Sequence, residues 1–342
     1  MIHKNRNSIL FSILGLALLF MFILDISLGS VTIPFKEVFT SLTGGEASKT
    51  TWEYIIINYR LPKAITAVLV GVGLAISGLL MQTLFRNPLA GPDVLGLSSG
   101  AILAVAVVIL GAGLLPSFLQ SILVSPYALV LASTLGSTAV LVLVLLVAQR
   151  LRNTMAILIV GLMFGSFTSA IVGVLTYFSS AEQLQKFTFW SLGSLGNLSW
   201  ASIAILSVCV GLGLLLSAAS IKPLNALLLG ENYAKSMGLN YTRVRLIIIF
   251  ATSILAGSIT AFAGPIAFIG LAVPHIAKLT FQTSNHAVLY WSTFFYGGII
   301  MLFCDIASQL PGLDTTLPIN AITSIIGAPV VIYLLMKKRN FQ

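Results

Sequence analysis

The chain has 342 residues, of which 58% are hydrophobic and 8% are charged, and its mean hydropathy is +1.04. Soluble domains carry about 25% charged residues, so this composition excludes a soluble protein and predicts one that crosses a membrane many times. The formal charge of +9 is therefore explained first by membrane topology rather than by an anionic ligand, because Lys and Arg gather on the cytoplasmic side of membrane proteins.

Ten apolar segments are long enough to cross about 30 Å of hydrocarbon. They predict an all-α polytopic membrane protein with a single transmembrane domain over residues 1–342. We expect the first segment to be a retained span, because no convincing signal-peptide cleavage site follows it. In chain order, the predicted spans cover residues 8–28, 62–84, 94–112, 126–148, 154–178, 201–221, 246–263, 265–281, 288–308 and 318–336.

The distribution of basic residues predicts the orientation of these spans. If the N-terminus is cytoplasmic, the C-terminus is cytoplasmic too, and thirteen of the 18 basic residues lie inside. This bias agrees with the positive-inside rule. The thirteen are Lys4, Arg6, Arg86, Arg150, Arg152, Lys222, Lys235, Arg243, Arg245, Lys278, Lys337, Lys338 and Arg339, and the five outside are Lys36, Lys49, Arg60, Lys63 and Lys186.

The first external segment, residues 29–61, is mixed in charge and leads into Pro62, a residue that suits the first turn of a helix. Arg60 and Lys63 are three positions apart, so on a helix they share one face at the outer membrane surface. Two interpretations are open for this pair. It consists either of ordinary snorkelling cations or of a docking site for an acidic external partner.

Residues 77–101, at the end of the second span, contain prolines and glycines that interrupt the helix. Broken backbone at membrane depth is tolerated only where protein or a water-filled path surrounds it. The fifth span carries a small residue at every fourth position, which suits either close packing of another helix or the lining of a translocation pathway. These small residues are Gly161, Gly165, Ser169 and Gly173.

Residues 222–245 interrupt the apolar spans with five charged side chains and form a predicted cytoplasmic loop. They read as two short helical turns, roughly 224–229 and 232–237. Each turn is followed by a glycine, Gly230 or Gly238, that can close it in the left-handed conformation.

The first of these turns carries an apolar face. Leu224, Leu227 and Leu228 recur at helical spacing, so this face is expected to rest on the membrane domain while the other faces water. We therefore expect a cytoplasmic partner to push on this loop and the rest of the chain to move in response.

The sequence contains no phosphate-binding loop, metalloprotease motif, nucleophile elbow or paired Cys or His set. No catalytic residue, metal site or cofactor is therefore expected. Asp25 and Asp305 are the acidic residues within spans, and both lie near outer ends. Ion-driven carriers usually need ionisable or unwound sites near the midplane, so this chain is expected to draw on an outside energy source. The rival class is an ion-coupled secondary transporter.

Four intramembrane side chains have no assigned role. His275 is ordinarily a packed, hydrogen-bonded histidine, and Cys209 and Cys304 are ordinarily buried structural thiols. Asp305 is a functional candidate by its position within a span, although solvation or capping explains it equally well.

Ten motifs in a fixed order resemble the permease subunits of type II ABC importers for iron-siderophores, haem and cobalamin. The resemblance runs from about residue 50 to the C-terminus. The motifs are RLP at Arg60–Pro62, SG at Ser77–Gly78, Gln82, RNPLAGP at Arg86–Pro92, LG at Leu95–Gly96, WSLGSL at Trp190–Leu195, LLLGENYAKSMG at Leu227–Gly238, FIGLAVPHIAK at Phe268–Lys278, Asp305 and IIGAP at Ile325–Pro329.

The resemblance implies ten spans per subunit in the cytoplasmic (inner) membrane and a dimer, homomeric or with a related subunit, around a central pathway. It also implies two cytoplasmic ABC ATPase subunits that hydrolyse ATP, an external substrate-binding protein, and no nucleic acid. The implied cargo is a ferric siderophore, with haem or cobalamin as alternatives. Arg60 and Lys63 match the external basic pair that meets the binding protein. The implied ATPase-coupling residues are Leu227, Leu228, Gly230, Glu231, Ala234 and Gly238.

The sequence departs from the family pattern in three places. Gln309 stands where an arginine usually follows the aspartate of the ninth span. Thr316 and Asn320 stand where Glu-x-Pro-x-Gly is common, and Asn285, His286 and Ala287 replace a frequent Asp-His-Arg. The docking surface is therefore expected to be less basic than is usual for the family.

Overall fold

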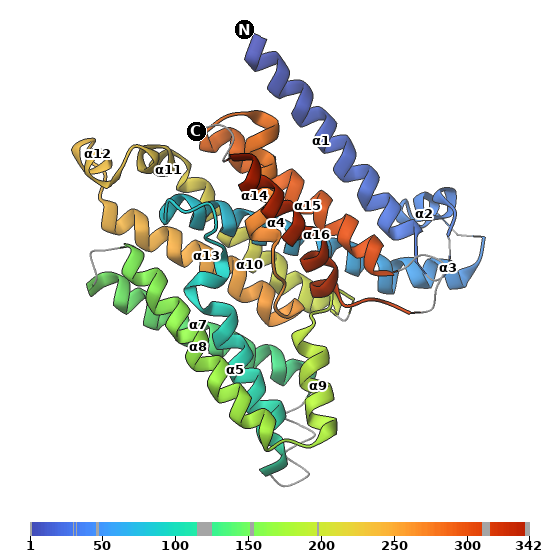
Figure 1. Ribbon diagram of the computed structural model, residues 1–342. Helices are drawn as coiled ribbons and strands as arrows, with labels where there is room; N and C mark the ends of the chain where they lie inside the picture. Colours follow the sequence, from blue (N-terminus) through green and yellow to red (C-terminus); the bar gives the residue numbers. More distant parts are fainter. Residues whose placement is uncertain are drawn as a thin grey trace. The chain divides into compact units, whose positions relative to one another are not determined.

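The computed structural model describes residues 2–29, 31, 33–45, 48–114, 125–150, 154–196, 198–309 and 315–338. Every regular element within these ranges is a helix (Figure 1). The chain forms two compact units, and two of the four boundaries between them fall within long helices, α4 (Leu61–Leu84) and α10 (Trp200–Ala219). Unit 1 comprises Met1–Ile76, Ser194–Val208 and Ala267–Gln342, and unit 2 comprises Ser77–Gly193 and Cys209–Ile266.

In unit 1, one long helix packs against three other helices. This helix, α15, packs against α1, α14 and α16, and α14 also packs against α16. Near the end of α1, the elements α3, η1 and α4 follow one another without an intervening loop. Besides the first part of α4 and of α10, the unit contains α1 (Ile2–Ser27), α2 (Phe35–Leu42), α3 (Thr50–Ile55), the π-helical turn η1 (Ile56–Arg60), α14 (Ile269–Phe281), α15 (His286–Gln309) and α16 (Ile319–Lys338).

In unit 2, α5 is the central helix. It contacts α7, α8, α9 and α13, and Figure 1 shows α5, α7 and α8 running side by side. Val105, Ala106, Ile109 and Leu110 form a buried core against apolar side chains of α7, α8 and α9. The unit contains η2 (Pro92–Leu95), α5 (Leu97–Leu110), η3 (Gly111–Leu114), α7 (Pro126–Arg150), α8 (Thr154–Tyr177), α9 (Ala181–Ser191), α11 (Ile221–Leu228), α12 (Glu231–Ser236) and α13 (Tyr241–Ala263), with the remainder of α4 and α10.

Each of the ten predicted spans overlaps one of these helices, so the predicted all-α polytopic fold is confirmed. Among the described residues, seven helices are long and apolar enough to cross a membrane, and three apolar helices are shorter. The 14 residues of α5 reach only about 21 Å along the helix axis, less than the hydrocarbon thickness. The shorter helices are Leu97–Leu110, Ile269–Phe281 and Ile319–Tyr333.

The span predicted at residues 246–263 begins five residues too late. The helix α13 starts at Tyr241, because the Oδ1 atom of Asn240 accepts a hydrogen bond from the Arg243 N–H at 3.0 Å and caps the first turn. The predicted loop at 222–245 is shortened accordingly, and its last residues are helical.

The span predicted at residues 265–281 begins too early. The helix α14 starts only at Ile269, after an irregular stretch that contains Pro265. The Oδ1 atom of Asn320 accepts a hydrogen bond from the backbone N–H of Ala267 at 3.1 Å and so satisfies a donor that no helix satisfies. Asn320, a departure from the family pattern, thus supports broken backbone inside unit 1.

In each unit, two helices cross at a pair of facing glycines. In unit 1 a Cβ atom on Gly297 of α15 would lie 2.6 Å from the carbonyl oxygen of Gly71 of α4. In unit 2 a Cβ atom on Gly100 of α5 would lie 2.6 Å from the carbonyl oxygen of Gly136 of α7. Both distances are too short for any side chain, so these helix pairs depend on small residues, as membrane helices often do.

We expect Gly136→Ala to lower the midpoint of thermal unfolding in detergent, because overpacking a tight contact costs about 1–3 kcal/mol. The matched control is Gly211→Ala in α10, where a Cβ atom would meet nothing within 4 Å. That control should unfold at or slightly above the wild-type midpoint, since Ala favours a helix over Gly. Equal midpoints for the two variants would contradict the crossing.

Candidate functional site

The predicted coupling segment is folded as two short helices, α11 and α12, that connect α10 to α13. Pro223 lies in the first turn of α11, where its missing N–H has no helical partner to lose. The helices begin at Ile221 and Glu231, close to the turns predicted from the sequence. Glu231 and Lys235 form an exposed ion pair of 2.6 Å, four positions apart on α12.

The two glycines of this segment have different roles. Gly238 has a φ of +83°, and the bonds from Gly238 N–H to Lys235 O and from Leu239 N–H to Ala234 O close α12 at its C-terminal end. Gly230 instead precedes α12 as its N-cap, with φ 117° and ψ 156°, a conformation essentially limited to glycine. The prediction of a left-handed C-cap is right for Gly238 and wrong for Gly230.

The apolar face of α11 also differs from the prediction in one residue. Leu224 and Leu227 are buried as expected, but Leu228 is 45% exposed. Around the helix, the buried arc of α11 runs from Leu224 through Leu227 to Ala226. Leu228 lies just beyond Leu224, on the side away from Ala226, and is therefore left exposed. In the second helix, α12, Ala234 is fully buried and packs that helix against the protein.

An apolar patch is exposed on these two helices. It consists of large side chains with exposed fractions between 45% and 65%, next to the Glu231–Lys235 pair. Exposed apolar patches with a charged rim are typical of protein-binding surfaces. We call this the coupling patch, and its members are Leu228, Leu229, Tyr233 and Met237.

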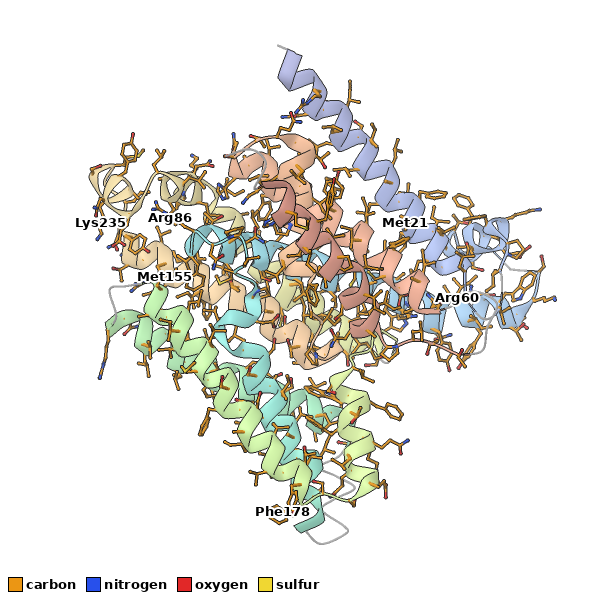
Figure 2. All side chains as sticks on the ribbon, in the orientation of Figure 1. Met21, Arg60, Arg86, Met155, Phe178 and Lys235 are labelled. Atoms are coloured by element: carbon orange, nitrogen blue, oxygen red, sulfur yellow. The ribbon has the colours of Figure 1, made fainter. Side chains whose placement is uncertain are left out.

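Arg86, the first residue of the RNPLAGP motif, binds the coupling segment directly (Figure 2). Its Nε and Nη2 atoms donate to the carbonyl oxygen of Leu227 at 3.2 and 2.8 Å. At the other end of the segment, Arg245 is buried and donates to the carbonyl oxygen of Ala148, near the end of α7. The segment is thus tied to unit 2 at both ends.

The predicted docking pair, Arg60 and Lys63, is engaged in contacts within unit 1. Arg60 is only 8% exposed and lies where α1, α2 and η1 meet (Figure 2). Its Nη1 atom donates to the carbonyl oxygens of Ile26 and Ser27 at 2.8 and 2.9 Å, and Nη2 donates to that of Val31. The two cations point to different partners, because Lys63 instead binds α15.

Lys63 belongs to a buried polar cluster with Asp25, Asp305 and Gln309. The Nζ atom of Lys63 lies 3.0 Å from Oδ1 of Asp305, whose side chain is 1% exposed. The Nε2 atom of Gln309 donates to Asp305 at 3.1 Å and to Asp25 at 3.2 Å, and so joins α15 to α1. Asp305 is therefore neither solvated nor a helix cap. The contact between Asp25 and Gln309 could not be predicted from a local sequence pattern, because the two residues lie 284 positions apart.

We expect Lys63→Met to destabilise the protein by about 3 kcal/mol, because it leaves the buried Asp305 carboxylate without its cation. This is the lower end of the range for buried pairs, since the Lys63 side chain keeps 21% exposure. The change should appear as a lower thermal unfolding midpoint in detergent.

The control is Lys186→Met, which breaks the exposed pair of Lys186 with Glu182 on α9. Surface pairs contribute little, so this variant should unfold at the wild-type midpoint. Equal destabilisation by both substitutions would show that the cluster does not hold α4 to α15.

The small residues of α8 fall into two groups. Gly161 is buried, and its carbonyl oxygen lies 3.1 Å from the Cβ position of Gly96, while Gly165 is near the hydroxyl of Ser99. Ser169 and Gly173 are exposed, and nothing lies within 4 Å of the Cβ position of Gly173. Close packing therefore explains the first two positions, whereas the last two leave an open surface.

The remaining candidates show no reactive arrangement. Cys304 is buried and Cys209 half-buried, and both are free thiols, while His275 is half-buried in α14. Over the part of the chain that the structure describes, no group of three or more His, Cys, Asp or Glu side chains is placed to hold a metal ion.

Comparisons with known proteins place this geometry in a family context. The sequence profile of the FecCD transport family matches residues 17–337. The chain is 32% identical to the hemin transport system permease protein HmuU of Yersinia pestis, covering 95% of this chain and 96% of that protein. It is 36% identical to the vitamin B12 import system permease protein BtuC of Salmonella typhi, covering 83% and 84%.

A solved structure of a metal-chelate type ABC transporter in an inward-facing conformation has a similar fold. Its TM-score is 0.83 at 27% sequence identity, and the match covers 96% of this chain and 99% of that chain. The resemblance drawn from ten short motifs is thereby confirmed.

Proposed function

The chain belongs to the FecCD transport family, and from this membership we propose that it is the permease subunit of an ATP-driven importer in the cytoplasmic (inner) membrane. It moves its cargo by alternating access, and ATP is hydrolysed in separate partner subunits. The proposed assembly contains two ABC ATPase subunits, an external substrate-binding protein and a second permease subunit, identical or related.

The coupling patch is the observation that carries this proposal. A transporter driven by a separate ATPase needs a folded surface outside its spans on which that ATPase can act. The patch supplies apolar contact area, and it is anchored by the buried side chains of Leu224, Leu227 and Ala234. In this proposal Leu228 and Glu231 contact the ATPase directly, whereas Gly230 and Gly238 set the shape of the segment.

The proposed cargo is a bulky iron chelate of the ferric siderophore type. The relatives named for haem and vitamin B12 and the metal-chelate transporter support a large chelate as cargo, with haem or cobalamin as alternatives. We propose that the small residues of α8, Gly161, Gly165, Ser169 and Gly173, lie along the translocation pathway, where the exposed Ser169 and Gly173 leave room for it.

The external binding protein is proposed to dock near Arg60 and Lys63. These two residues differ in how accessible they are to a partner. The guanidinium group of Arg60 donates to backbone carbonyls, whereas 21% of the Lys63 side chain is exposed. We therefore assign the larger share of any contact with an acidic partner to Lys63.

The proposed function is tested by uptake of radiolabelled iron as ferric siderophores, haem and labelled cobalamin, in cells with and without the gene. Siderophore-iron uptake should disappear on deletion and return with the gene. Loss of haem or cobalamin uptake alone would change the cargo and keep the mechanism. Uptake that collapses with an ionophore while cellular ATP is preserved would instead support the rival secondary transporter.

We expect the double substitution Tyr233→Ser and Met237→Ser to weaken binding of the ATPase subunits by about tenfold or more, because truncating interface anchors costs about 1–2 kcal/mol or more each. Co-purification of the tagged permease with its ATPase measures this loss. The control is Phe189→Ser, which removes an aromatic side chain that is 64% exposed on α9, a segment predicted to lie outside. Undiminished ATPase binding by the double variant would remove the coupling patch from the interface.

A further inference from the structure

We propose that Arg86 is a positioning residue that links the coupling segment to the α4–α5 connection, so that movement of α11 and α12 is passed to residues 87–96. This inference rests on the proposed function. It names the element through which a push on the coupling patch reaches the membrane helices of unit 2.

The backbone at Arg86 indicates that its side chain is required. Arg86 has a φ of +48°, and the bonds from Arg86 N–H to Thr83 O and from Asn87 N–H to Gln82 O close the end of α4. This is the left-handed position at which glycine is most common, because a Cβ atom is strained there. An arginine at a position that suits glycine is explained by what its guanidinium group does.

The guanidinium group binds one of the last carbonyls of α11. Its Nε and Nη2 atoms both donate to the Leu227 carbonyl oxygen, which also accepts from Gly230 N–H at 3.2 Å. A charged donor at a helix C-terminus makes a stronger hydrogen bond than a neutral one and complements the helix dipole. The Cβ position of Gly230 is 3.1 Å from Nη2 of Arg86, so a side chain at Gly230 would crowd this contact.

The connection beyond Arg86 is short and stiff. Pro88 and Pro92 fix two of its backbone angles, and Pro92 opens the 3-10 turn η2. The turn η2 contacts α5, α8 and α13, and Gly96 at its end lies against Gly161 of α8. A displacement of Leu227 therefore acts through Arg86 on the stretch that packs against the proposed pathway helix.

The main test uses Arg86→Gly, which suits the left-handed backbone but removes the guanidinium group. In liposomes that contain the permease, its ATPase subunits and the binding protein, cargo uptake per ATP hydrolysed should fall about tenfold, within the usual range of coupling between sites. Arg86→Lys keeps the charge but carries its donors on a single nitrogen, so it should give an intermediate ratio. ATPase co-purification should be unchanged in both variants.

The matched control is Arg150→Gly, which removes an exposed arginine at the C-terminal residue of α7. It should leave uptake per ATP at the wild-type value. The proposal is overturned if Arg86→Gly keeps the wild-type ratio, or if Arg86→Gly and Arg150→Gly lower it equally. Loss of ATPase binding in both Arg86→Gly and Arg86→Lys would also overturn it, because Arg86 would then serve assembly.

A second measurement does not depend on transport. Nitroxide labels at Leu89→Cys and Lys222→Cys, both exposed positions in unit 2, report the distance between the α4–α5 connection and α11. The wild-type background should give one narrow distance distribution, and Arg86→Gly should broaden it even without nucleotide. Identical distributions would remove the link. If the wild-type assembly neither imports cargo nor responds to ATP, the proposed function fails while this distance still tests the contact.

Discussion

Backbone carbonyls at the ends of buried helices need donors, and in this chain arginine side chains supply several of them. The last four carbonyls of a helix have no partner within it, and inside a membrane protein water is scarce. Guanidinium groups are well suited to this task, because they carry five donors and stay charged. The pairs are Arg6 with Phe281 of α14, Arg60 with Ile26 and Ser27 of α1, Arg86 with Leu227 of α11, and Arg245 with Ala148 of α7.

The sequence predicted the helices well because hydropathy over some twenty residues is a local signal. It also located the broken stretch after α4, where Pro92 interrupts the helical pattern, but it extended a span over the irregular stretch that begins at Pro265. It could not predict that Arg60 and Lys63 turn inwards, because their partners come from α1 and α15, far away in sequence. Spacing of three on a helix gives a shared face, but it does not say what covers that face.

Within the coupling segment, the same limit applies at the level of single residues. The periodicity of Leu224, Leu227 and Leu228 predicted an apolar face, yet which edge of that face is covered depends on the packing of α11 against the rest of unit 2. Glycine in the sequence indicates an unusual φ but not which one, so Gly230 and Gly238 looked alike and adopt different conformations. The contact of Arg86 with Leu227 spans 141 positions and carried no signal in the sequence.

The neutral side chain of Gln309 has a consequence for the electric field at this end of unit 1. An arginine at position 309 would add one formal positive charge to the cluster of Asp25, Asp305, Lys63 and Arg60, whereas glutamine adds none and bridges the two carboxyl groups through its amide nitrogen. A cluster with one positive charge fewer projects a weaker long-range potential, so it steers an acidic protein from a distance less strongly. The contribution of this cluster to the rate at which such a protein arrives therefore depends less on ionic strength than it would with arginine.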